Sequence, residues 1–474
     1  MTHRTTTTLR GVAVAVGLAL LVGCTSTEPD PEPTDPAPTS TAEPEPGPEE
    51  VALPDHAAGR AAAWVMSLLD DEPGAPLPEA EERFAPEFLE ELPVEALAEV
   101  IDQLRTFGPW TVTAVEGTES ELVARIEGVQ SFDLQLSLDE DELIQGLFFA
   151  TPAPDREPAA SWEELVEEVE DLPGSVSMLV ARPADQGCVA LDGGPAGPVG
   201  SAAGEQLPVG SVAKLYVLGA VVEAVEAGDL AWDTDLTLTD DLRSLPSGEL
   251  QEEPAGTTVT VEAAAEAMIS ISDNTATDLL IDAVGREQVE AALTSMGHSD
   301  PAANTPFPST RELFQLGWGG GAELRNQWRD AGTEERRALL EELPDGEIDI
   351  DVVEVTRATV WHRDVDWFAT AEDLCLAHAA LAELAGTEAG APVRDILALN
   401  PGVVPADAGA PAYLAFKGGS VTGVMAGAWY AEDAEGDPVV VTLQSASRDP
   451  AGGLPVTTMV GIATDALRLA LQDD

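Results

Sequence analysis

Lysine is almost absent from this chain. Among its 474 residues there are two lysines, Lys214 and Lys417, against twenty arginines. An arginine stays protonated in proteins, whereas a desolvated lysine can give up its proton. The two lysines that the chain retains are therefore candidates for a task that needs a neutral amine, such as the activation of a serine nucleophile.

Positive charge of any kind is scarce. The chain has 22 Lys and Arg residues against 87 Asp and Glu residues, which gives a formal net charge of -65. Nucleic acids and anionic membrane surfaces are bound through basic patches, so this composition argues against both as electrostatic partners. Hydrophobic residues still make up 44% of the chain, and its length predicts two or three domains with a sizeable core.

Residues that bind metals are few and dispersed. The five histidines are scattered along the chain and no cysteine or histidine cluster has metal-ligand spacing, so we expect no metal and no other cofactor. Cys188 and Cys375 could pair in an oxidising compartment, and buried free thiols are an equal alternative.

Long hydrophobic runs are missing apart from one at the N-terminus. Arg4 and Arg10 precede an apolar stretch, Gly11 to Val22. This stretch is too short to span a membrane permanently. The stretch ends in Leu21-Val22-Gly23-Cys24, which resembles the lipobox of bacterial lipoproteins. Residues 1–23 are therefore expected to be a signal peptide and Cys24 to be the lipidated first residue. An ordinary signal peptide with a chance cysteine is the alternative.

A tether is expected after the signal peptide. Residues 24–54 are rich in Pro, Thr, Ser and Glu and show no apolar periodicity, which is typical of an extended linker. A lipidated end followed by such a linker predicts a protein anchored to the outer face of the cytoplasmic membrane.

Residues 55–151 predict a small α+β domain. Apolar residues at helical spacing predict helices over 57–69 and 93–104. Short alternating runs then predict an antiparallel meander with strands at 110–115, 121–126, 132–138 and 144–150. Helices followed by a curved sheet resemble the cone-shaped fold of steroid isomerases and nuclear transport factors. No polar residue of this domain stands out as catalytic, which favours a role as a spacer or docking domain.

A second domain is expected from residue 159 to 474. A proline-rich break, residues 152–158, precedes it. Strand-like runs near its two ends, at 175–181, 426–430 and 439–444, enclose a mainly helical middle. This order indicates a mixed α/β domain in which a helical subdomain is inserted into a sheet domain.

Three short motifs follow one another in this second domain. Ser211-Val212-Ala213-Lys214 leads into an apolar helix, Ser272-Asp273-Asn274 begins 61 residues after Ser211, and Phe416-Lys417-Gly418-Gly419-Ser420 comes ahead of a strand. In this order they resemble the S-x-x-K, S-D-N and K-[TS]-G motifs of the penicillin-recognising serine hydrolases, and within them the class A β-lactamases. Both lysines of the chain lie inside these motifs.

The first motif makes chemical sense by itself. Residues three apart on a helix share a face, so the Ser211 hydroxyl and the Lys214 amine can meet. The N-terminus of a helix also offers free N–H groups to a developing oxyanion.

The resemblance assigns a role to each residue. It implies that Ser211 forms an acyl-enzyme, that Lys214 accepts its proton, and that Ser272 passes a proton to the leaving group. Lys417 would attract a substrate carboxylate and, as a neighbouring cation, lower the pKa of Lys214.

Substrate-binding residues follow from the same resemblance. Asn274 would hydrogen-bond the substrate amide, and the backbone N–H of Ser420 would complete the oxyanion hole with that of Ser211. Gly419 and Phe416 would belong to the same substrate-binding strand.

The third motif departs from the class A pattern. The hydroxyl residue that usually follows its lysine is missing after Lys417, with Ser420 or Thr422 as replacements. The 145 residues between Ser272 and Lys417 also imply an insertion, expected around residues 319–365.

The glutamate that activates the deacylating water in class A enzymes has no clear counterpart. Residues 305–314 stand in its place, and Glu312 is the nearest carboxylate. Glu312 fits better as a first-turn helix residue after a Ser309 or Thr310 cap.

The sequence thus predicts a β-lactamase-like serine hydrolase preceded by a small isomerase-like domain. This arrangement is similar to a two-domain type of protein from the clavulanic acid pathway. The expected substrates are β-lactams, esters or D-alanyl peptides. The alternative is a β-lactam or cell-wall binding protein, a sensor that is acylated without turnover.

Overall fold

The structure of the chain is a computed structural model. It describes residues 51–128, 131–139, 142–150, 156–184, 187–346, 348, 350, 355, 357–403, 411–450 and 452–472. The expected signal peptide, Cys24 and most of the expected tether lie outside these residues. The chain forms two compact units, Met1–Pro154 and Asp155–Asp474.

The first unit contains the predicted helices and meander. Its elements are α1 (Ala57–Leu69), α2 (Ala80–Arg83), α3 (Pro86–Glu91), α4 (Val94–Arg105), β1 (Thr111–Gly117), β2 (Glu121–Glu127), β3 (Ser131–Leu138) and β4 (Ile144–Ala150). The strands pair antiparallel in the order β1-β2-β3-β4. Every second side chain of β3 is buried, as expected for a sheet with one face on a core.

Helices α1 and α4 pack on this sheet around a shared apolar core. Val65 of α1, Ile101 of α4 and Leu134 of β3 are completely buried in it. The buried Arg105 closes the end of α4, since its guanidinium donates to the carbonyl oxygens of Leu68 and Ala75 at 2.8 Å each. The unit therefore has a hydrophobic core of its own.

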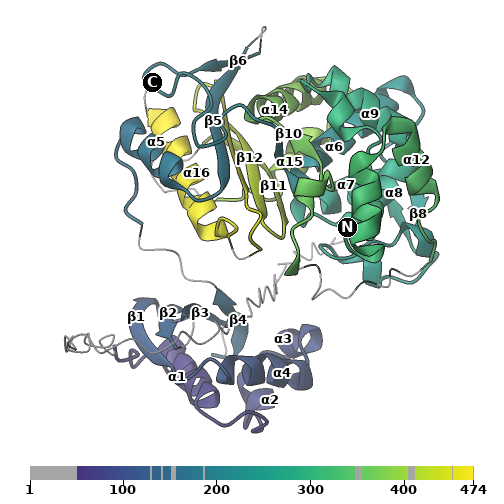
Figure 1. The fold of residues 1–474 in the computed structure, drawn as a ribbon. Helices are drawn as coiled ribbons and strands as arrows, with labels where there is room; N and C mark the ends of the chain where they lie inside the picture. The colour runs from purple at the N-terminus through teal and green to yellow at the C-terminus, as the bar shows by residue number, and fades with distance from the viewer. Residues whose placement is uncertain are drawn as a thin grey trace, which may run out of the picture. The chain divides into compact units, whose positions relative to one another are not determined.

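The second unit is built on a five-stranded antiparallel sheet with the order β11-β12-β13-β5-β6. Its strands are β5 (Ser175–Ala184), β6 (Gly187–Ala190), β11 (Tyr413–Val421), β12 (Val424–Glu432) and β13 (Pro438–Ala446). The first and last parts of the unit thus meet in one sheet, because β5 pairs with β13 (Figure 1). The predicted β-lactamase-like arrangement of a sheet with an inserted helical region is confirmed.

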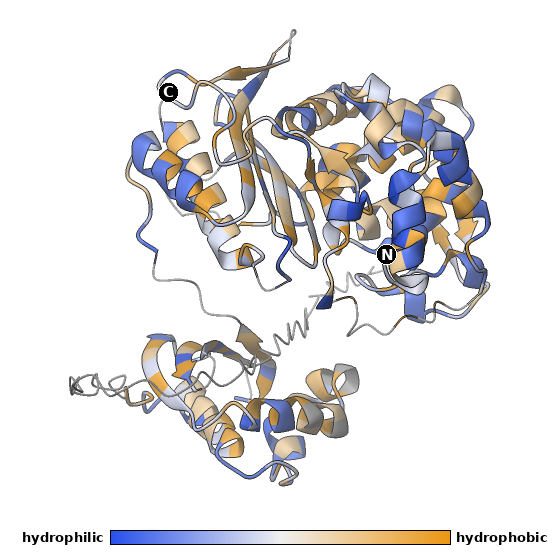
Figure 2. Ribbon diagram, in the orientation of Figure 1, coloured by the Kyte–Doolittle hydropathy of each residue, from blue (hydrophilic) through white to orange (hydrophobic). Residues whose placement is uncertain are grey.

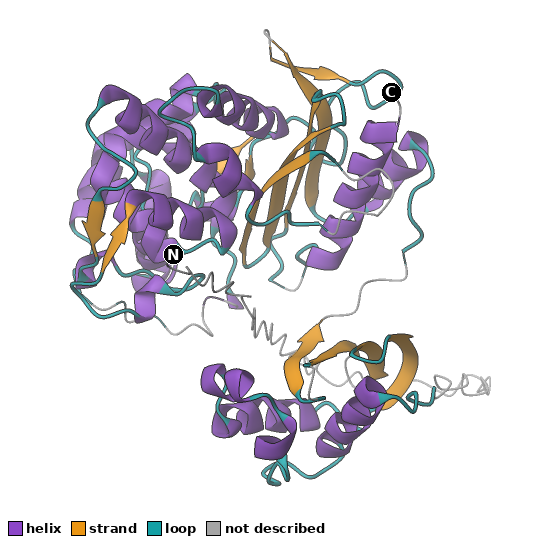
Figure 3. Cartoon of the chain, turned by 180° about the vertical axis from the view of Figure 1, so that it is seen from behind, coloured by secondary structure: helices purple, strands orange, loops and turns teal. Residues whose placement is uncertain are grey.

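Helices cover both faces of this sheet. One face packs against α5 (Trp162–Asp171) and α16 (Val456–Gln472), and Figure 3 shows them on one side with the larger helical group on the other. Figure 2 shows hydrophobic and hydrophilic residues interleaved along α5 and α16, as expected for helices with one face on a sheet. The other face packs against α6 (Lys214–Ala227) and α14 (Ala371–Ala385).

The remaining helices form the inserted region. They are α7 (Val261–Ser270), α8 (Asn274–Val284), α9 (Arg286–Ser295), α10 (Thr310–Phe314), α11 (Gly321–Asp330), α12 (Thr333–Glu341) and α15 (Val393–Ala398). Shorter turns and strand pairs join them: η1 (Gly210–Ala213), η2 (Asp240–Leu242), η3 (Leu250–Glu252), η4 (Pro301–Asn304), η5 (Gln315–Gly319), η6 (Trp361–Arg363), β7 (Leu207–Pro208) with β10 (Phe368–Ala369), and β8 (Asp235–Thr237) with β9 (Thr258–Thr260). The insertion expected at 319–365 contains α11 and α12.

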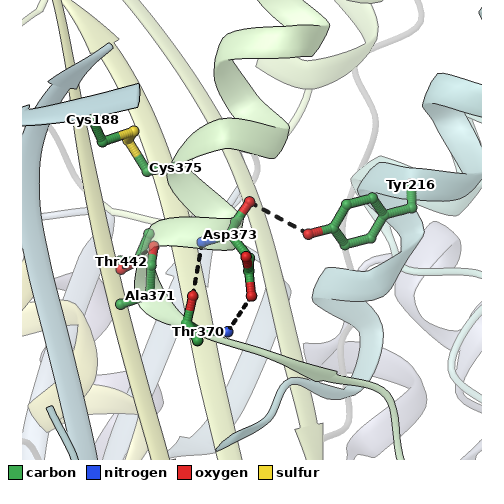
Figure 4. Close-up of a disulfide and its surroundings, with 7 residues drawn as sticks. All are labelled: Cys188, Tyr216, Thr370, Ala371, Asp373, Cys375 and Thr442. Atoms are coloured by element: carbon green, nitrogen blue, oxygen red, sulfur yellow. Dashed lines mark hydrogen bonds between the residues drawn. A yellow bond between two sulfur atoms is a disulfide. The ribbon is translucent and has the colours of Figure 1, made fainter. Parts of the chain in front are cut away.

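A disulfide joins the edge strand β6 to α14. The sequence left the state of Cys188 and Cys375 open, and in the structure they are bonded across 187 residues (Figure 4). Two further contacts hold the start of α14. Thr370 caps the helix by accepting from the Asp373 N–H at 3.0 Å, and the Tyr216 hydroxyl of α6 donates to the Asp373 carbonyl at 3.3 Å.

The described residues contain neither a membrane-spanning helix nor a metal-binding cluster. No described helix combines the length and apolarity needed to cross a membrane. Among the same residues, no group of three or more His, Cys, Asp or Glu side chains is arranged to hold a metal ion.

Candidate active site

Ser211 lies in a tight turn directly ahead of α6. The short strand β7 ends at Pro208, the 3-10 turn η1 follows, and Lys214 is the first residue of α6. Gly210 has φ +49°, a left-handed conformation that favours glycine. A side chain there would also lie 3.1 Å from the Ser420 nitrogen. The turn before Ser211 therefore needs a glycine for two reasons.

Strand β11 passes close to this turn at Gly419. A Cβ on Gly419 would lie 2.1 Å from the Val209 carbonyl oxygen and 2.7 Å from the Ser211 nitrogen. Only a glycine allows so close an approach. This approach brings the backbone of Ser420 beside that of Gly210. The two predicted oxyanion donors, the N–H groups of Ser211 and Ser420, belong to these two segments.

Ser272 lies between the two lysines of the chain. Its hydroxyl oxygen is 3.1 Å from the Lys214 amine and 2.9 Å from the Lys417 amine. Lys214 also donates to the Ser272 carbonyl at 2.6 Å and to the Asn274 side-chain oxygen at 2.7 Å. Four of the residues singled out in the three motifs thus form one hydrogen-bonded group.

Both amines are buried and have lowered pKa values. Lys214 and Lys417 are each 2% exposed. Burial lowers the pKa of Lys214 well below its usual value, and the charge of Lys417 lowers it further, against the opposing effect of Asp278 and Asp273. Burial alone lowers the pKa of Lys417 to about 7. A neutral lysine amine is therefore accessible near neutral pH.

The segment around Ser272 is held by its neighbour Asp273. Ser272 has φ +57°, which is uncommon for a residue with a side chain. Asp273 caps α8 by accepting from the Ala276 N–H at 2.8 Å, and its other oxygen accepts from the Glu249 and Leu250 N–H groups at 2.8 and 3.0 Å. Those contacts fix the turn that presents Ser272 to the lysines.

A cavity of about 190 Å³ opens at Ser211. Of the residues predicted from the motifs, Ser211, Asn274 and Ser420 line it. Its other lining residues are Gly210, Pro246, Ser247, Thr310, Leu313, Phe314, Asp366, Trp367 and Val421. The buried lysines connect to the cavity through Asn274, which accepts from Lys214.

The expectation that Phe416 contacts the substrate is wrong. Successive side chains of a strand point to opposite faces of the sheet. Lys417 faces the helical region and Ser272, so Phe416 faces the other way. There it stacks on Trp429, with ring centroids 4.9 Å apart, in the core under α5 and α16.

Two further expectations concern hydroxyl and carboxylate groups. Thr422 donates to the Val355 carbonyl at 2.5 Å and does not line the cavity, so of the two expected replacements Ser420 is the one that lies at it. Glu312 is a first-turn residue of α10 in a capping box with Ser309, as predicted. It also pairs with the Arg286 guanidinium at 2.7 and 2.9 Å and lines a separate cavity of about 310 Å³.

Sequence reasoning missed Asp366. This residue lines the Ser211 cavity and accepts hydrogen bonds from the N–H groups of Gly210 at 2.9 Å and Trp367 at 2.7 Å. It is 5% exposed, and burial raises its pKa to about 7. The pairing of β10 with β7 brings it to Ser211 from 155 residues along the chain, and nothing in the local sequence signals that pairing.

Two family models match parts of this chain. Residues 181–466, more than half of the chain, match the model of the beta-lactamase enzyme family. The chain belongs to this family. Residues 53–144 of this β-lactamase family member match a second model, described as the N-terminal part of the ORF 12 gene product. No curated protein matches the chain.

Solved structures with similar folds include a β-lactamase from Sphaerobacter thermophilus, which is 23% identical, covers 66% of this chain and 97% of its own, and has a TM-score of 0.45. A mutant of PBP-A in an acyl-enzyme complex with penicillin G is 17% identical, with coverages of 64% and 95% and a TM-score of 0.43. An ancestral class A β-lactamase is 19% identical, with coverages of 66% and 98% and a TM-score of 0.42. At these values the likenesses carry no information on the substrate of this chain.

Proposed function

We propose that this protein is a serine hydrolase that works through an acyl-enzyme on Ser211. The observation that carries the proposal is the placement of the Ser272 hydroxyl between the amines of Lys214 and Lys417, next to a cavity lined by Ser211. Serine nucleophiles are activated by an adjacent base, and a desolvated lysine can be that base.

The first step is the acylation of Ser211. Its hydroxyl oxygen attacks the substrate carbonyl while the neutral Lys214 amine takes the proton. The N–H groups of Ser211 and Ser420 stabilise the oxyanion. As the tetrahedral intermediate collapses, the bond to the leaving group breaks, and the proton passes from Lys214 through Ser272 to that group.

Substrates of this reaction are β-lactams, simple esters or D-alanyl peptides. Lys417 in its protonated form attracts the carboxylate that β-lactams and peptidoglycan stems carry, and Asn274 binds the amide. Residues 181–466 match the beta-lactamase enzyme family, so a β-lactam is the first probe.

One observation favours a second candidate function. Glu312, the glutamate nearest to the place of the class A deacylation base, is bound to Arg286 and lies outside the Ser211 cavity. If no other group activates water, the acyl-enzyme persists, and the protein acts as a β-lactam or cell-wall sensor.

An acylation assay tests the proposal. The full-length protein is incubated separately with nitrocefin, a fluorescent penicillin and a p-nitrophenyl ester, and intact mass is followed. We expect a covalent adduct that Ser211→Ala abolishes, while Ser67→Ala, an exposed serine of the first unit, keeps it. Lys214→Arg preserves the charge and should also eliminate acylation, because an arginine cannot serve as the base. Absence of both an adduct and turnover would sink both functions.

We also propose that the protein acts outside the cytoplasm, held to the membrane by lipidated Cys24. The disulfide supports this location, because disulfides persist in oxidising compartments. Cys24→Ala should move the protein from the membrane fraction to the soluble fraction of expressing cells.

A further inference from the structure

Asp366 is a buried carboxyl group that the proposed acylation does not use. Of the described residues that line the Ser211 cavity, it is the only one with an acidic or basic side chain. It lies in the turn between η6 and β10, beside the turn that carries Ser211.

One oxygen of this carboxyl group is fixed and the other is without a partner. Oδ1 accepts from the Gly210 N–H at 2.9 Å and the Trp367 N–H at 2.7 Å. Oδ2 is buried and has no hydrogen-bond partner among the described atoms. Buried polar oxygens are almost always hydrogen-bonded, so an unpartnered one on a residue that lines a cavity points to a bound water or ligand.

A purely structural role would not need a carboxyl group here. The two N–H donors are satisfied by Oδ1 alone, and the side-chain oxygen of an asparagine would accept the same two hydrogen bonds. What the second oxygen adds is a site that can take up and release a proton.

We propose that Asp366 is the general base of deacylation, and that its Oδ2 holds the water that attacks the acyl group on Ser211. This inference rests on the proposed acyl-enzyme. Asp366 would take the place of Glu312, which is paired with Arg286 and lies outside the cavity. We therefore expect turnover rather than a permanently acylated sensor.

The step balances as follows in atoms and charge. The water oxygen forms a bond to the acyl carbon as Asp366 takes one of its protons. The tetrahedral intermediate then collapses, the bond from the acyl carbon to the Ser211 oxygen breaks, and that oxygen receives the proton from Asp366. The products are a free serine, an aspartate and the carboxylic acid of the substrate.

The ionisation of Asp366 suits this task. Burial raises its pKa to about 7, against the lowering effect of the hydrogen bonds from the Gly210 and Trp367 N–H groups. A general base works best when its pKa lies near the working pH. The carboxylate form, which is the active one, increases as the pH rises through 7.

Other ionisable groups lie on the elements around the site. On the elements packed around Asp366 they are Lys214 at the start of α6, Lys417 on β11, Asp278 on α8, and Arg311 and Glu312 on α10; Arg363 and Asp364 lie on its own segment. The pKa of Lys417 is also lowered to about 7. A titration near pH 7 is therefore assigned to Asp366 only if it disappears when Asp366 is replaced.

The test separates deacylation from acylation. The full-length wild type and Asp366→Asn are acylated with a fluorescent penicillin, freed of excess reagent, and transferred to buffers from pH 5 to 9, and the loss of adduct is followed by intact mass. We expect Asp366→Asn to acylate within a few-fold of the wild-type rate and to deacylate about 100-fold more slowly. The wild-type deacylation rate should fall below pH 7, and the variant should lose this limb.

A matched control uses the same substitution two residues away. Asp364 is 51% exposed, pairs with Arg336 and does not line the cavity, so Asp364→Asn should deacylate as the wild type does. Circular dichroism of both variants checks their fold.

Three outcomes overturn the inference while leaving acylation standing. They are equal deacylation by Asp366→Asn and the wild type, an unchanged pH limb in the variant, and a wild-type adduct that does not decay at any pH tested. Absence of both an adduct and turnover on the wild type is different, because it overturns the proposed function itself.

Discussion

At the scale of single residues, the site depends on two amines whose charge is set by burial. Lys214 and Lys417 both approach the Ser272 hydroxyl and both have lowered pKa values. Two adjacent ammonium groups repel each other, so protonation of one favours the neutral form of the other. The same pair can thus hold a base and a cation at once.

In the proposed function Lys417 attracts the carboxylate of an anionic substrate, and its lowered pKa would make this attraction depend on pH. Its ammonium form, which attracts a carboxylate, predominates below pH 7 and is lost as the pH rises through that value. The acylation rate for a penicillin should fall, relative to that for an uncharged p-nitrophenyl ester, by up to about tenfold per pH unit above 7. The ratio of the two rate constants cancels groups that act on both substrates. An unchanged ratio from pH 6 to 9 would contradict this role of Lys417.

Residue patterns also decided how well the site could be predicted. The three motifs led to Ser211, Lys214, Ser272, Asn274 and Lys417. In the structure the last four form one hydrogen-bonded group, and Ser211 lines a cavity with Asn274. Phe416 could have been excluded from the site by sequence alone, because neighbouring residues of a strand point to opposite faces of the sheet and Lys417 is the next residue. The place of Asp366 beside Ser211 could not be predicted, because it depends on the pairing of two strands of two residues each.

At the scale of elements, the contact between β11 and η1 sets the oxyanion region. Gly419 and Gly210 allow the two backbones to approach, and a methyl group at either position would meet the backbone of the other element. This contact is where the strand of the third motif meets the turn of the first.

Gly419→Ala should therefore damage the site. A Cβ at 2.1 Å from the Val209 oxygen and 2.7 Å from the Ser211 nitrogen forces β11 away from η1. We expect a loss of about 1–3 kcal/mol in the free energy of unfolding and a fall in acylation rate of at least tenfold. Chemical denaturation and the acylation assay measure the two effects. Gly197→Ala is the control, because a Cβ there has no neighbour within 4 Å, and equal behaviour of the two variants would contradict the argument.

The disulfide is a second link between elements, and its removal should lower stability. It ties β6 to α14 across 187 residues. The unfolded chain gains freedom when such a loop is opened, so reduction should cost about 2–5 kcal/mol of the free energy of unfolding of the second unit. Thermal unfolding with and without a reductant measures this. The double variant Cys188→Ser and Cys375→Ser should unfold at the temperature of the reduced protein, with or without the reductant. If the reductant still lowered the unfolding temperature of this variant, the disulfide would not be the cause.

At the scale of the whole molecule, periodicity predicted the elements better than their long-range contacts. The meander of the first unit lies within a few residues of its expected strands, because alternation and turns are local signals. The pairing of β5 with β13 and of Cys188 with Cys375 joins segments with no shared local pattern. Such contacts arise from the packing of the complete core, which periodicity does not encode.

The strand order of the second unit also fixes when each part of the chain can fold. The edge of β5 that pairs with β13 stays open until β13, which ends at Ala446, has been synthesised. The described strands of the first unit pair only with strands consecutive in the sequence, so their sheet can be complete soon after residue 150 has been synthesised. Because non-local pairing slows folding, the second unit spends the longer time with an open strand edge. A ribosome-stalling series should show a protease-resistant first unit long before Ser211 and Lys417 lie in one folded site.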